Sequence, residues 1–319
     1  MMGGELAAAR ITDPRLRQAY GLCRRLNAAH GRTFFLTTRL LAPCQRPGIH
    51  ALYGFARLAD DIVDEPGSAP EARLTELSQR LKAGLECGHS TDPVMAAVID
   101  TATRYRLAPQ LFASFLASMR MDLTVSDYPT RAELDRYVHG SAEVIGVQVL
   151  PILGTVGDPA EAAPYAAALG KAFQLTNFLR DIAEDLDRGR VYMPADELAA
   201  YGVNRDLLTW CRERGCLDSR VRAALAAQHE HARKVYRFAT TGIELLHPVS
   251  RSCVTTALVL YSEILDRIEA NDYQVFRRRV TVPQSRRMQV AGPALARAIW
   301  ARRGGRAHPL ASAAEASVR

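Results

Sequence analysis

The chain has 319 residues, of which 48% are hydrophobic, enough for a substantial core in one large domain or two smaller ones. No stretch reaches the roughly 18 uninterrupted apolar residues of a membrane-spanning helix. The first residues also lack the basic and apolar segments of a signal peptide, so we expect a cytoplasmic protein.

The formal net charge is +7, and much of the excess lies in arginine clusters at 277–279, 286–287 and 302–303. Because no aromatic-interleaved basic motif accompanies these clusters, we do not expect nucleic-acid binding. Contact with a membrane surface, or plain solubility, is favoured instead. The six cysteines show no Cys-x-x-C pattern and no histidine at zinc spacing, which is typical of reduced thiols.

The first predicted helix covers residues 15–29, with Asp13 as its cap and Pro14 at its first position. The segment His30-Gly31-Arg32-Thr33-Phe34 follows. It combines a basic residue, a hydroxyl group and backbone N–H groups near a helix start, which suits either an ordinary loop or a cradle for a phosphate group.

The next helix, predicted over 48–65, carries a polar stripe on an otherwise apolar surface. Tyr53, Arg57, Asp60 and Asp64 recur at offsets 0, 4, 7 and 11, which places them on one face. Apolar residues surround the stripe, so the helix is expected to be largely buried. Its acids are therefore not simple solubilising groups.

Amphipathic helices are then predicted over 71–86, 93–105 and 109–125, and these supply core rather than chemistry. Residues 130–153 follow as a glycine-containing helix. Tyr137, Gly140, Ser141, Val144 and Gln148 fall near one of its faces, and glycine there lets another group approach the backbone closely.

A second polar stripe lies on the helix predicted over 160–188, where Gln174, Asn177, Asp181 and Asp185 recur at offsets 0, 3, 7 and 11. It suits either a solvated face with charge pairs or a row of oxygen ligands for Mg²⁺. The matching row at 53–64 favours the ligands, because buried carboxylates one turn apart repel each other unless a cation lies between them.

Gly189 permits a turn after this helix, and the turn presents Arg190 and Tyr192. Further helices are predicted over 196–201, 205–214, 219–240 and 252–272, with His229 and His231 at the surface. No strand pattern is present, so the chain is predicted to be all-α. The domain is expected to span 1–290, and the mixture of Ala, Arg, Gly and Pro over 291–319 predicts a flexible tail.

The motifs Asp60-Asp-Ile-Val-Asp64 and Asn177-Phe-Leu-Arg-Asp181-Ile-Ala-Glu-Asp185-Leu-Asp-Arg-Gly-Arg190-Val-Tyr192-Met-Pro resemble the squalene/phytoene synthase family. The resemblance runs from about residue 30 to about residue 280. It implies one all-α domain, a class I isoprenoid-synthase-like helical bundle around a central cavity. The implied reaction, a step of carotenoid biosynthesis, joins two geranylgeranyl diphosphates head to head through a cyclopropylcarbinyl diphosphate to give phytoene and diphosphate.

The resemblance also implies roles for individual residues. Metal ligands for Mg²⁺, or Mn²⁺ in its place, are Asp60, Asp64, Asn177, Asp181 and Asp185. The four aspartates and Tyr137 are the implied catalytic residues. Implied substrate contacts are His30, Gly31, Arg32, Thr33, Phe34, Tyr53, Arg57, Gln174, Arg180, Arg190, Tyr192, Tyr261 and Arg279. The chain departs from the family at Gly31, where Ser is usual, and at Glu143, where a glycine is usual.

No dinucleotide-binding motif is present, and we expect no NADPH requirement, although squalene synthases bind their reductant without such a motif. Expected partners are prenyl diphosphates, a membrane surface contacted peripherally, and downstream carotenoid enzymes. The nearest alternative is a sibling that uses C15 chains to make dehydrosqualene, presqualene diphosphate or hydroxysqualene. A non-catalytic assembly factor would be expected to lose acids from one row. A terpene cyclase or chain-elongating synthase would not carry the segment from Arg180 to Tyr192.

Overall fold

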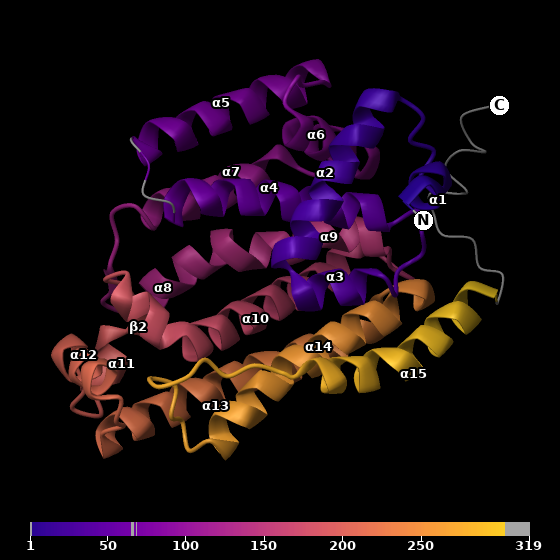
Figure 1. Cartoon of the computed structure of the whole chain (residues 1–319). Helices are drawn as coiled ribbons and strands as arrows, with labels where there is room; N and C mark the ends of the chain where they lie inside the picture. The colour runs from indigo at the N-terminus through magenta and orange to yellow at the C-terminus, as the bar shows by residue number, and fades with distance from the viewer. Residues whose placement is uncertain (1, 65–66, 68, 304–319) are drawn as a thin grey trace.

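The computed structural model describes residues 2–64, 67 and 69–303, and helices make up most of this part of the chain (Figure 1). The long helices run roughly alongside one another in stacked rows, with α5 and α15 on opposite sides of the molecule (Figure 1). The all-α prediction is confirmed. Within the described residues, no helix combines the length and apolarity needed to cross a membrane.

The first part of the chain forms helices joined by short connections. Their bounds are α1 Met2–Ala8, α2 Pro14–His30, α3 Arg32–Thr38, α4 Arg46–Asp64, α5 Pro70–Cys87, α6 Pro93–Tyr105 and α7 Pro109–Met121.

The second part contains the longest helix, α10, and a short two-stranded sheet. The bounds are β1 Asp127–Tyr128, α8 Arg131–Val138, the π-helical turn η1 His139–Glu143, α9 Val144–Leu153, α10 Pro159–Asp187, β2 Val191–Pro194, α11 Ala195–Ala199, α12 Arg205–Arg214, α13 Ser219–Thr241, the 3₁₀ turn η2 Gly242–Leu245, α14 Pro248–Ala270 and α15 Gln284–Arg303.

Helix starts follow from capping residues in the sequence. The Asp13 carboxylate accepts a hydrogen bond of 2.7 Å from the Arg15 backbone N–H, and Pro14 occupies the first helical position as predicted. Asp158 caps α10 in the same way, accepting from the Ala160 N–H at 2.8 Å. These caps satisfy backbone donors that the helices themselves leave unpaired.

Helix α10 lies at the centre of the fold, where it packs against α9, α13 and α14. Leu175, Leu179 and Ile182 on its buried side join the largest hydrophobic cluster. Helix α4 packs mainly against α2 and α6 in a second cluster, and Ala51, Phe55 and Ala59 form its buried side. The two polar stripes predicted from the sequence therefore lie on helices that the core holds firmly.

The turn η1 replaces regular helix in the segment predicted over 130–153, and Gly170 of α10 explains how it packs. A Cβ atom at Gly170 would lie 2.3 Å from the carbonyl oxygen of Ala142, closer than any real contact. Glycine thus lets α10 approach the η1 backbone directly. Glu143, the departure from the family pattern, turns outward and accepts from the His139 ring at 3.0 Å.

Three local predictions differ from the structure. The segment 30–34, for which an ordinary loop was one alternative, instead contains the start of helix α3 at Arg32. The strands β1 and β2 pair in parallel, with Asp127 opposite Val191, and no strand was predicted because the pair is too short to show a sequence period. His229 is buried rather than exposed, and its Nε2 atom lies 3.2 Å from the Leu265 carbonyl oxygen.

The predicted flexible tail over 291–319 is wrong for its first part, because α15 continues as a helix through residues 291–303 and packs on α14. The segment was predicted as a tail because its composition is dominated by a few residue types, among them alanine. Alanine is, however, also a good helix former. Residues 304–319 lie outside the described residues, as do Glu65 and Pro66 at the predicted end of the first acid-row helix.

The packing at Gly170 can be tested by adding one methyl group. We expect Gly170→Ala to lower the free energy of unfolding by about 1–3 kcal/mol, because the backbone of η1 must shift. Urea denaturation measures the change. Gly292→Ala is the matched control, since nothing lies within 4 Å of its Cβ position and alanine favours the helix. Equal stability in the two variants would contradict the tight contact.

Candidate active site

The first acid row ends helix α4, and its two acids have different surroundings. Asp60 forms no ion pair or hydrogen bond through its carboxylate with any described residue. Burial, and then the nearby Asp64 carboxylate, raise the pKa of Asp60 to about 7. Arg57, predicted on the same stripe, instead forms an ion pair with Asp61. Asp60 is thus a half-buried acid without an ion-pair partner among the described residues.

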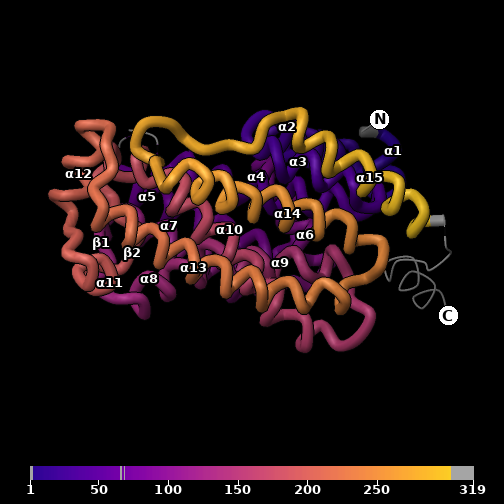
Figure 2. Tube along the Cα trace, turned by 90° about the horizontal axis from the view of Figure 1, so that it is seen from below, coloured from indigo at the N-terminus to yellow at the C-terminus, as the bar shows by residue number. Residues whose placement is uncertain are grey.

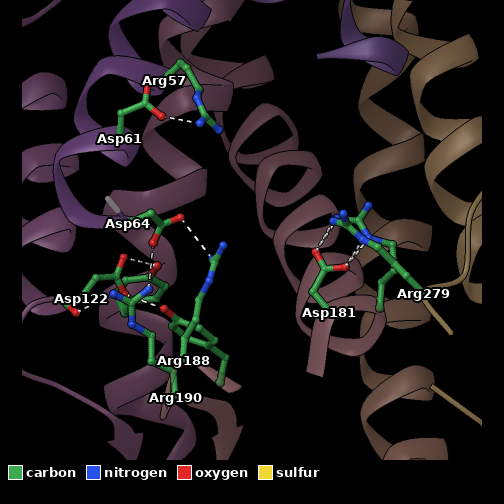
Figure 3. A network of polar contacts seen from close by, with 11 residues as sticks. Arg57, Asp61, Asp64, Asp122, Asp181, Arg188, Arg190 and Arg279 are labelled. Atoms are coloured by element: carbon green, nitrogen blue, oxygen red, sulfur yellow. Dashed lines mark hydrogen bonds and ion pairs between the residues drawn. The ribbon is translucent and has the colours of Figure 1, made fainter. Parts of the chain in front are cut away.

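Asp64 is neutralised by arginines that follow α10. Arg188 Nη1 lies 3.2 Å from Asp64 Oδ2, and Arg190 Nη1 lies 3.2 Å from Asp64 Oδ1 (Figure 3). Arg190 also donates to the carbonyl oxygen of Asp122 at 3.1 Å. The segment after α10 therefore returns to the end of α4 and places two guanidinium groups beside the first acid row.

The second acid row on α10 repeats this division of roles. Asp181 accepts two hydrogen bonds from Arg180, at 2.7 and 2.5 Å, and two from Arg279, at 2.8 and 2.9 Å. Asp185 has no such partner among the described residues. Burial, and then the Asp181 carboxylate, raise the pKa of Asp185 to about 7.

Figure 3 shows the paired acid of each row in a separate group, with Asp64 among Arg188, Arg190 and Asp122 on one side and Asp181 with Arg279 on the other. No three histidine, cysteine or acidic side chains of the described residues are placed closely enough to form a ready-made metal site. Any cation bound here would therefore take part of its coordination from another source, such as the oxygens of a bound ligand.

The donor atoms nevertheless fit a hard divalent cation. Asp60 and Asp185 are carboxylates without an ion-pair partner among the described residues, and a bound cation would favour their ionised form. The Asn177 Oδ1 atom is buried without a hydrogen-bond partner in the described structure, while its Nδ2 lies 3.5 Å from Gln174 Oε1. Carboxylate and amide oxygens are the ligands that Mg²⁺ prefers.

An apolar cavity of about 300 Å³ lies next to the second row. Gln174 and Asn177 line it, and along α10 its wall continues through Phe173 and Leu169 to Ala162. Helices α3, α9 and α14 supply most of the remaining wall, almost entirely with apolar side chains. Such a cavity suits a long hydrocarbon chain whose polar end lies among the acids.

Aromatic rings gather where the cavity meets the acid row. The Tyr261 ring centroid lies 5.2 Å from that of Phe34 and 4.4 Å from that of Phe173. Phe34 and Phe173 line the cavity, and Tyr261 is buried behind them. Phe34 and Tyr261 were predicted from the sequence, whereas Phe173 was missed because an apolar residue on a buried helix is usually core.

Asp122, just after α7, is a second residue that the sequence analysis missed. It accepts hydrogen bonds from the Tyr192 hydroxyl at 2.7 Å and from the Tyr137 hydroxyl at 2.8 Å. Burial raises the pKa of Asp122, while the two tyrosine hydrogen bonds lower it. Asp122 thus joins the predicted Tyr137 and Tyr192 to the first acid row, and no motif around it signals this position.

The segment 30–34 reaches the first acid row through Gly31. A Cβ atom at Gly31 would lie 2.8 Å from the Tyr53 ring and 2.5 Å from Asn27 Oδ1, so the serine usual in the family would not fit this packing unchanged. His30 and Arg32 are exposed, and Thr33 is partly buried. Burial raises the pKa of Tyr53 to about 12, which keeps its hydroxyl protonated.

The fold and the site together define a class: an all-helical protein with two acid-bearing helices, one of which, α10, lines an apolar cavity. A sequence model of the squalene/phytoene synthase family matches residues 27–286. The chain belongs to this family. The match contains every predicted site residue, from His30 to Arg279.

Curated relatives are similar over most of their length. Phytoene synthase of Arthrospira platensis is 39% identical over 285 residues, which cover 85% of this chain and 90% of the relative. 15-cis-Phytoene synthase of Synechocystis sp. is 38% identical over 287 residues, covering 86% and 83% respectively.

Solved structures of related enzymes share the fold. A dehydrosqualene synthase crystallised with a ligand superposes with a TM-score of 0.81 at 25% identity, covering 88% of this chain and 96% of that one. Squalene synthase HpnC from Alicyclobacillus acidocaldarius gives a TM-score of 0.75 at 26% identity, covering 83% and 98%.

The raised pKa of Asp60 predicts a pH dependence. In the metal-free protein its stabilising contribution is complete below the unfolded pKa of about 4, and it is lost as pH rises through about 7. We therefore expect the wild-type protein to lose stability relative to Asp60→Asn between about pH 5 and pH 7.5. Melting temperatures of both proteins in a chelator give the comparison.

The comparison with the variant removes the effect of other groups. Buried His50, whose pKa is lowered to about 3 mainly by burial, titrates alike in both proteins. Added Mg²⁺ is expected to reduce the difference, because a bound cation favours ionised Asp60. Parallel melting curves for the two metal-free proteins across this pH range would show that Asp60 has an ordinary pKa.

Proposed function

We propose that the protein is a prenyltransferase that condenses two geranylgeranyl diphosphate molecules head to head, giving phytoene and releasing diphosphate. The observation that carries the proposal is that the second polar stripe adjoins an apolar cavity, which Gln174 and Asn177 line, in a chain 37–39% identical to phytoene synthases over 85–86% of its length. The acids and arginines match the charged end of this substrate, and the cavity matches its hydrocarbon chain.

The proposed first half-reaction breaks the bond between C1 of one prenyl chain and its diphosphate. Asp60, Asp64, Asn177, Asp181 and Asp185 supply oxygen ligands for Mg²⁺ or Mn²⁺, which when bound would neutralise charge on the leaving diphosphate. Arg180, Arg188, Arg190 and Arg279 already lie beside the acid rows. Their guanidinium groups can pass from carboxylate to diphosphate when the substrate enters.

The allylic cation left behind must be kept from water. The apolar wall of the cavity excludes it, and the electron-rich rings of Phe34 and Phe173 line the end nearest the second acid row, with Tyr261 packed against both. Attack by the double bond of the second chain, with loss of a proton, gives the cyclopropylcarbinyl diphosphate. Its ionisation releases the second diphosphate, and rearrangement with loss of another proton gives phytoene.

A sibling reaction on C15 chains is the second candidate, favoured by the close superposition with a dehydrosqualene synthase. Both candidates use the same acids, so chain length separates them. All four main aspartates are present, which argues against a non-catalytic assembly factor. We also propose that the protein contacts a membrane surface, because the proposed substrate and product are lipids, and that it passes product to downstream carotenoid enzymes.

The decisive experiment supplies purified protein and Mg²⁺ with C15 or C20 diphosphate, with and without NADPH, and identifies the hydrocarbon by mass spectrometry. We expect phytoene from the C20 substrate without NADPH. Asp181→Asn should lower turnover by about a hundredfold or more while the protein melts normally. Asp187→Asn is the matched control, because Asp187 also lies on α10 but pairs with Arg212 outside the row.

A C15 product alone would replace the proposed reaction by its sibling. No product from either substrate, in protein that melts normally, would contradict the enzyme assignment. Full activity of Asp181→Asn would remove the second acid row from the mechanism.

Asp122 is proposed as a positioning residue, and its replacement tests this. In Asp122→Asn one tyrosine hydroxyl loses a carboxylate acceptor, so Tyr137 and Tyr192 are no longer held together beside the first acid row. We expect kcat to fall by about ten- to a hundredfold, with a smaller change in KM. Asp127→Asn, an exposed acid paired with Arg205, is the control. Wild-type kcat in Asp122→Asn would contradict this role.

A further inference from the structure

Helix α15 differs from the rest of the molecule in composition. Residues 284–303 contain five arginines and no acidic residue. Only the first three of these residues lie within the part of the chain that matches the family, which ends at residue 286. The match to the family thus says little about this helix, and its chemistry needs an explanation of its own.

The outer surface of α15 exposes large apolar side chains. Trp300 is 79% exposed, Met288 53%, Leu295 43% and Ile299 39%. Met288, Leu295 and Ile299 recur at offsets 0, 7 and 11, which is one stripe along the helix. The other large exposed apolar residues of the described chain are scattered singly over other elements. Such a concentration on one helix marks an interaction surface.

Unpaired positive charge accompanies this stripe. Arg287 and Arg297 of α15, and Arg32 and Arg39 at the two ends of neighbouring α3, form no ion pair with an acid in the described structure. Arg286, by contrast, lies 2.8 Å from Glu263. Exposed apolar side chains together with unpaired arginines are typical of helices that lie in the surface of an anionic membrane.

The inner face of α15 covers the wall of the apolar cavity. Ala294 and Ala298 are completely buried in one cluster with Leu41, Leu153 and Val254, which line the cavity. Arg302 anchors the helix by donating to the carbonyl oxygens of Leu40 and Leu41. Figure 2 shows α15 along the outside of α14, close to α3. The exposed stripe and the cavity wall are thus two sides of one helix.

We propose that the outer face of α15 docks on a lipid bilayer that contains anionic lipids, with the apolar stripe in the interface and the arginines among the headgroups. Docking would bring the cavity wall close to the bilayer in which prenyl lipids dissolve. Only this purpose rests on the proposed function; the docking itself does not. Symmetrical pairing with a second copy would bring arginine-rich faces together. A bilayer accepts both the apolar side chains and the charge.

The test uses the whole purified chain, without substrate, mixed with vesicles of phosphatidylcholine alone or with phosphatidylglycerol added. We expect co-sedimentation with the anionic vesicles that weakens as salt is raised. The chain has two tryptophans, so Trp210→Phe leaves Trp300 as the only reporter. Its emission should shift to shorter wavelength on anionic vesicles, as expected for an indole that leaves water.

Substitutions identify the surface. Leu295→Glu and Ile299→Glu should each weaken vesicle partitioning by about tenfold or more. Val156→Glu, at an exposed apolar position on another element, should leave it unchanged. Arg297→Glu should weaken binding more than Arg214→Glu, an exposed arginine of α12. All these side chains lie at the surface, so normal melting is expected.

Three outcomes would overturn the proposal. The first is equal binding to neutral and anionic vesicles, and the second is unchanged binding when Leu295→Glu and Ile299→Glu are combined. The third is a protein that does not bind vesicles but forms a dimer that these substitutions dissociate. The last would assign the face to a second copy. Because no substrate is present, a protein that makes phytoene without binding vesicles refutes docking alone. One that binds vesicles but makes no hydrocarbon refutes the proposed function alone.

Discussion

Repulsion between neighbouring carboxylates is the constraint on which the site depends. Each acid row holds two aspartates one turn apart, and in each row one acid is paired with arginines while the other is left without a partner. Asp64 and Asp181 are the paired acids, and Asp60 and Asp185 have pKa values raised to about 7. The fold thus tolerates the rows without a cation by neutralising half of each with guanidinium groups and allowing the other half to hold a proton near neutral pH. A ligand that brings both negative phosphate oxygens and cations would change both kinds of acid at once. The phosphate oxygens would compete for the arginines of the paired acids, and the cations would favour ionisation of the unpaired acids.

The same arginines connect elements that are distant in sequence. Arg188 and Arg190 follow α10 but contact Asp64 at the end of α4, and Arg279 follows α14 but contacts Asp181 on α10. Entry of an anionic ligand would draw these groups away from the carboxylates, since they are the nearest cations to it. Ligand binding is therefore coupled to the relative positions of α4, α10 and the segment that precedes α15. The family resemblance named Arg190 and Arg279, but not Arg188, as substrate contacts, and their present partners are the acids that the ligand would share.

The spacing of Asp60 with Asp64, and of Asn177 with Asp181 and Asp185, could be predicted because the helical period places these residues on one face whatever packs around them. The all-helical fold followed from the same period. Asp122 could not be predicted: it stands alone after α7 and enters the site only because the chain folds Tyr137 and Tyr192 onto it. Phe173 was missed because an apolar residue on a helix follows the same sequence pattern whether it packs in the core or lines a cavity. The error over residues 291–303 has a related cause, because alanine-rich sequence without a strong apolar stripe gives no signal for the partner it packs against.

The order of polar and apolar residues along helix α10 would fix the direction in which an amphipathic ligand binds. Asp185, Asp181, Asn177 and Gln174 follow one another toward its middle, and the cavity wall then continues through Phe173 and Leu169 to Ala162. From Asn177 to Ala162 is 15 residues, or about 22 Å of helix at 1.5 Å per residue. A molecule with a charged head and a long apolar tail can satisfy both parts of this surface in only one direction, because reversing it would bury the charge in the apolar end and expose the tail to the acids. The apolar end is also where Ala294 and Ala298 of α15 pack, so the second half of this helix lies over the part of the cavity that is far from the acids.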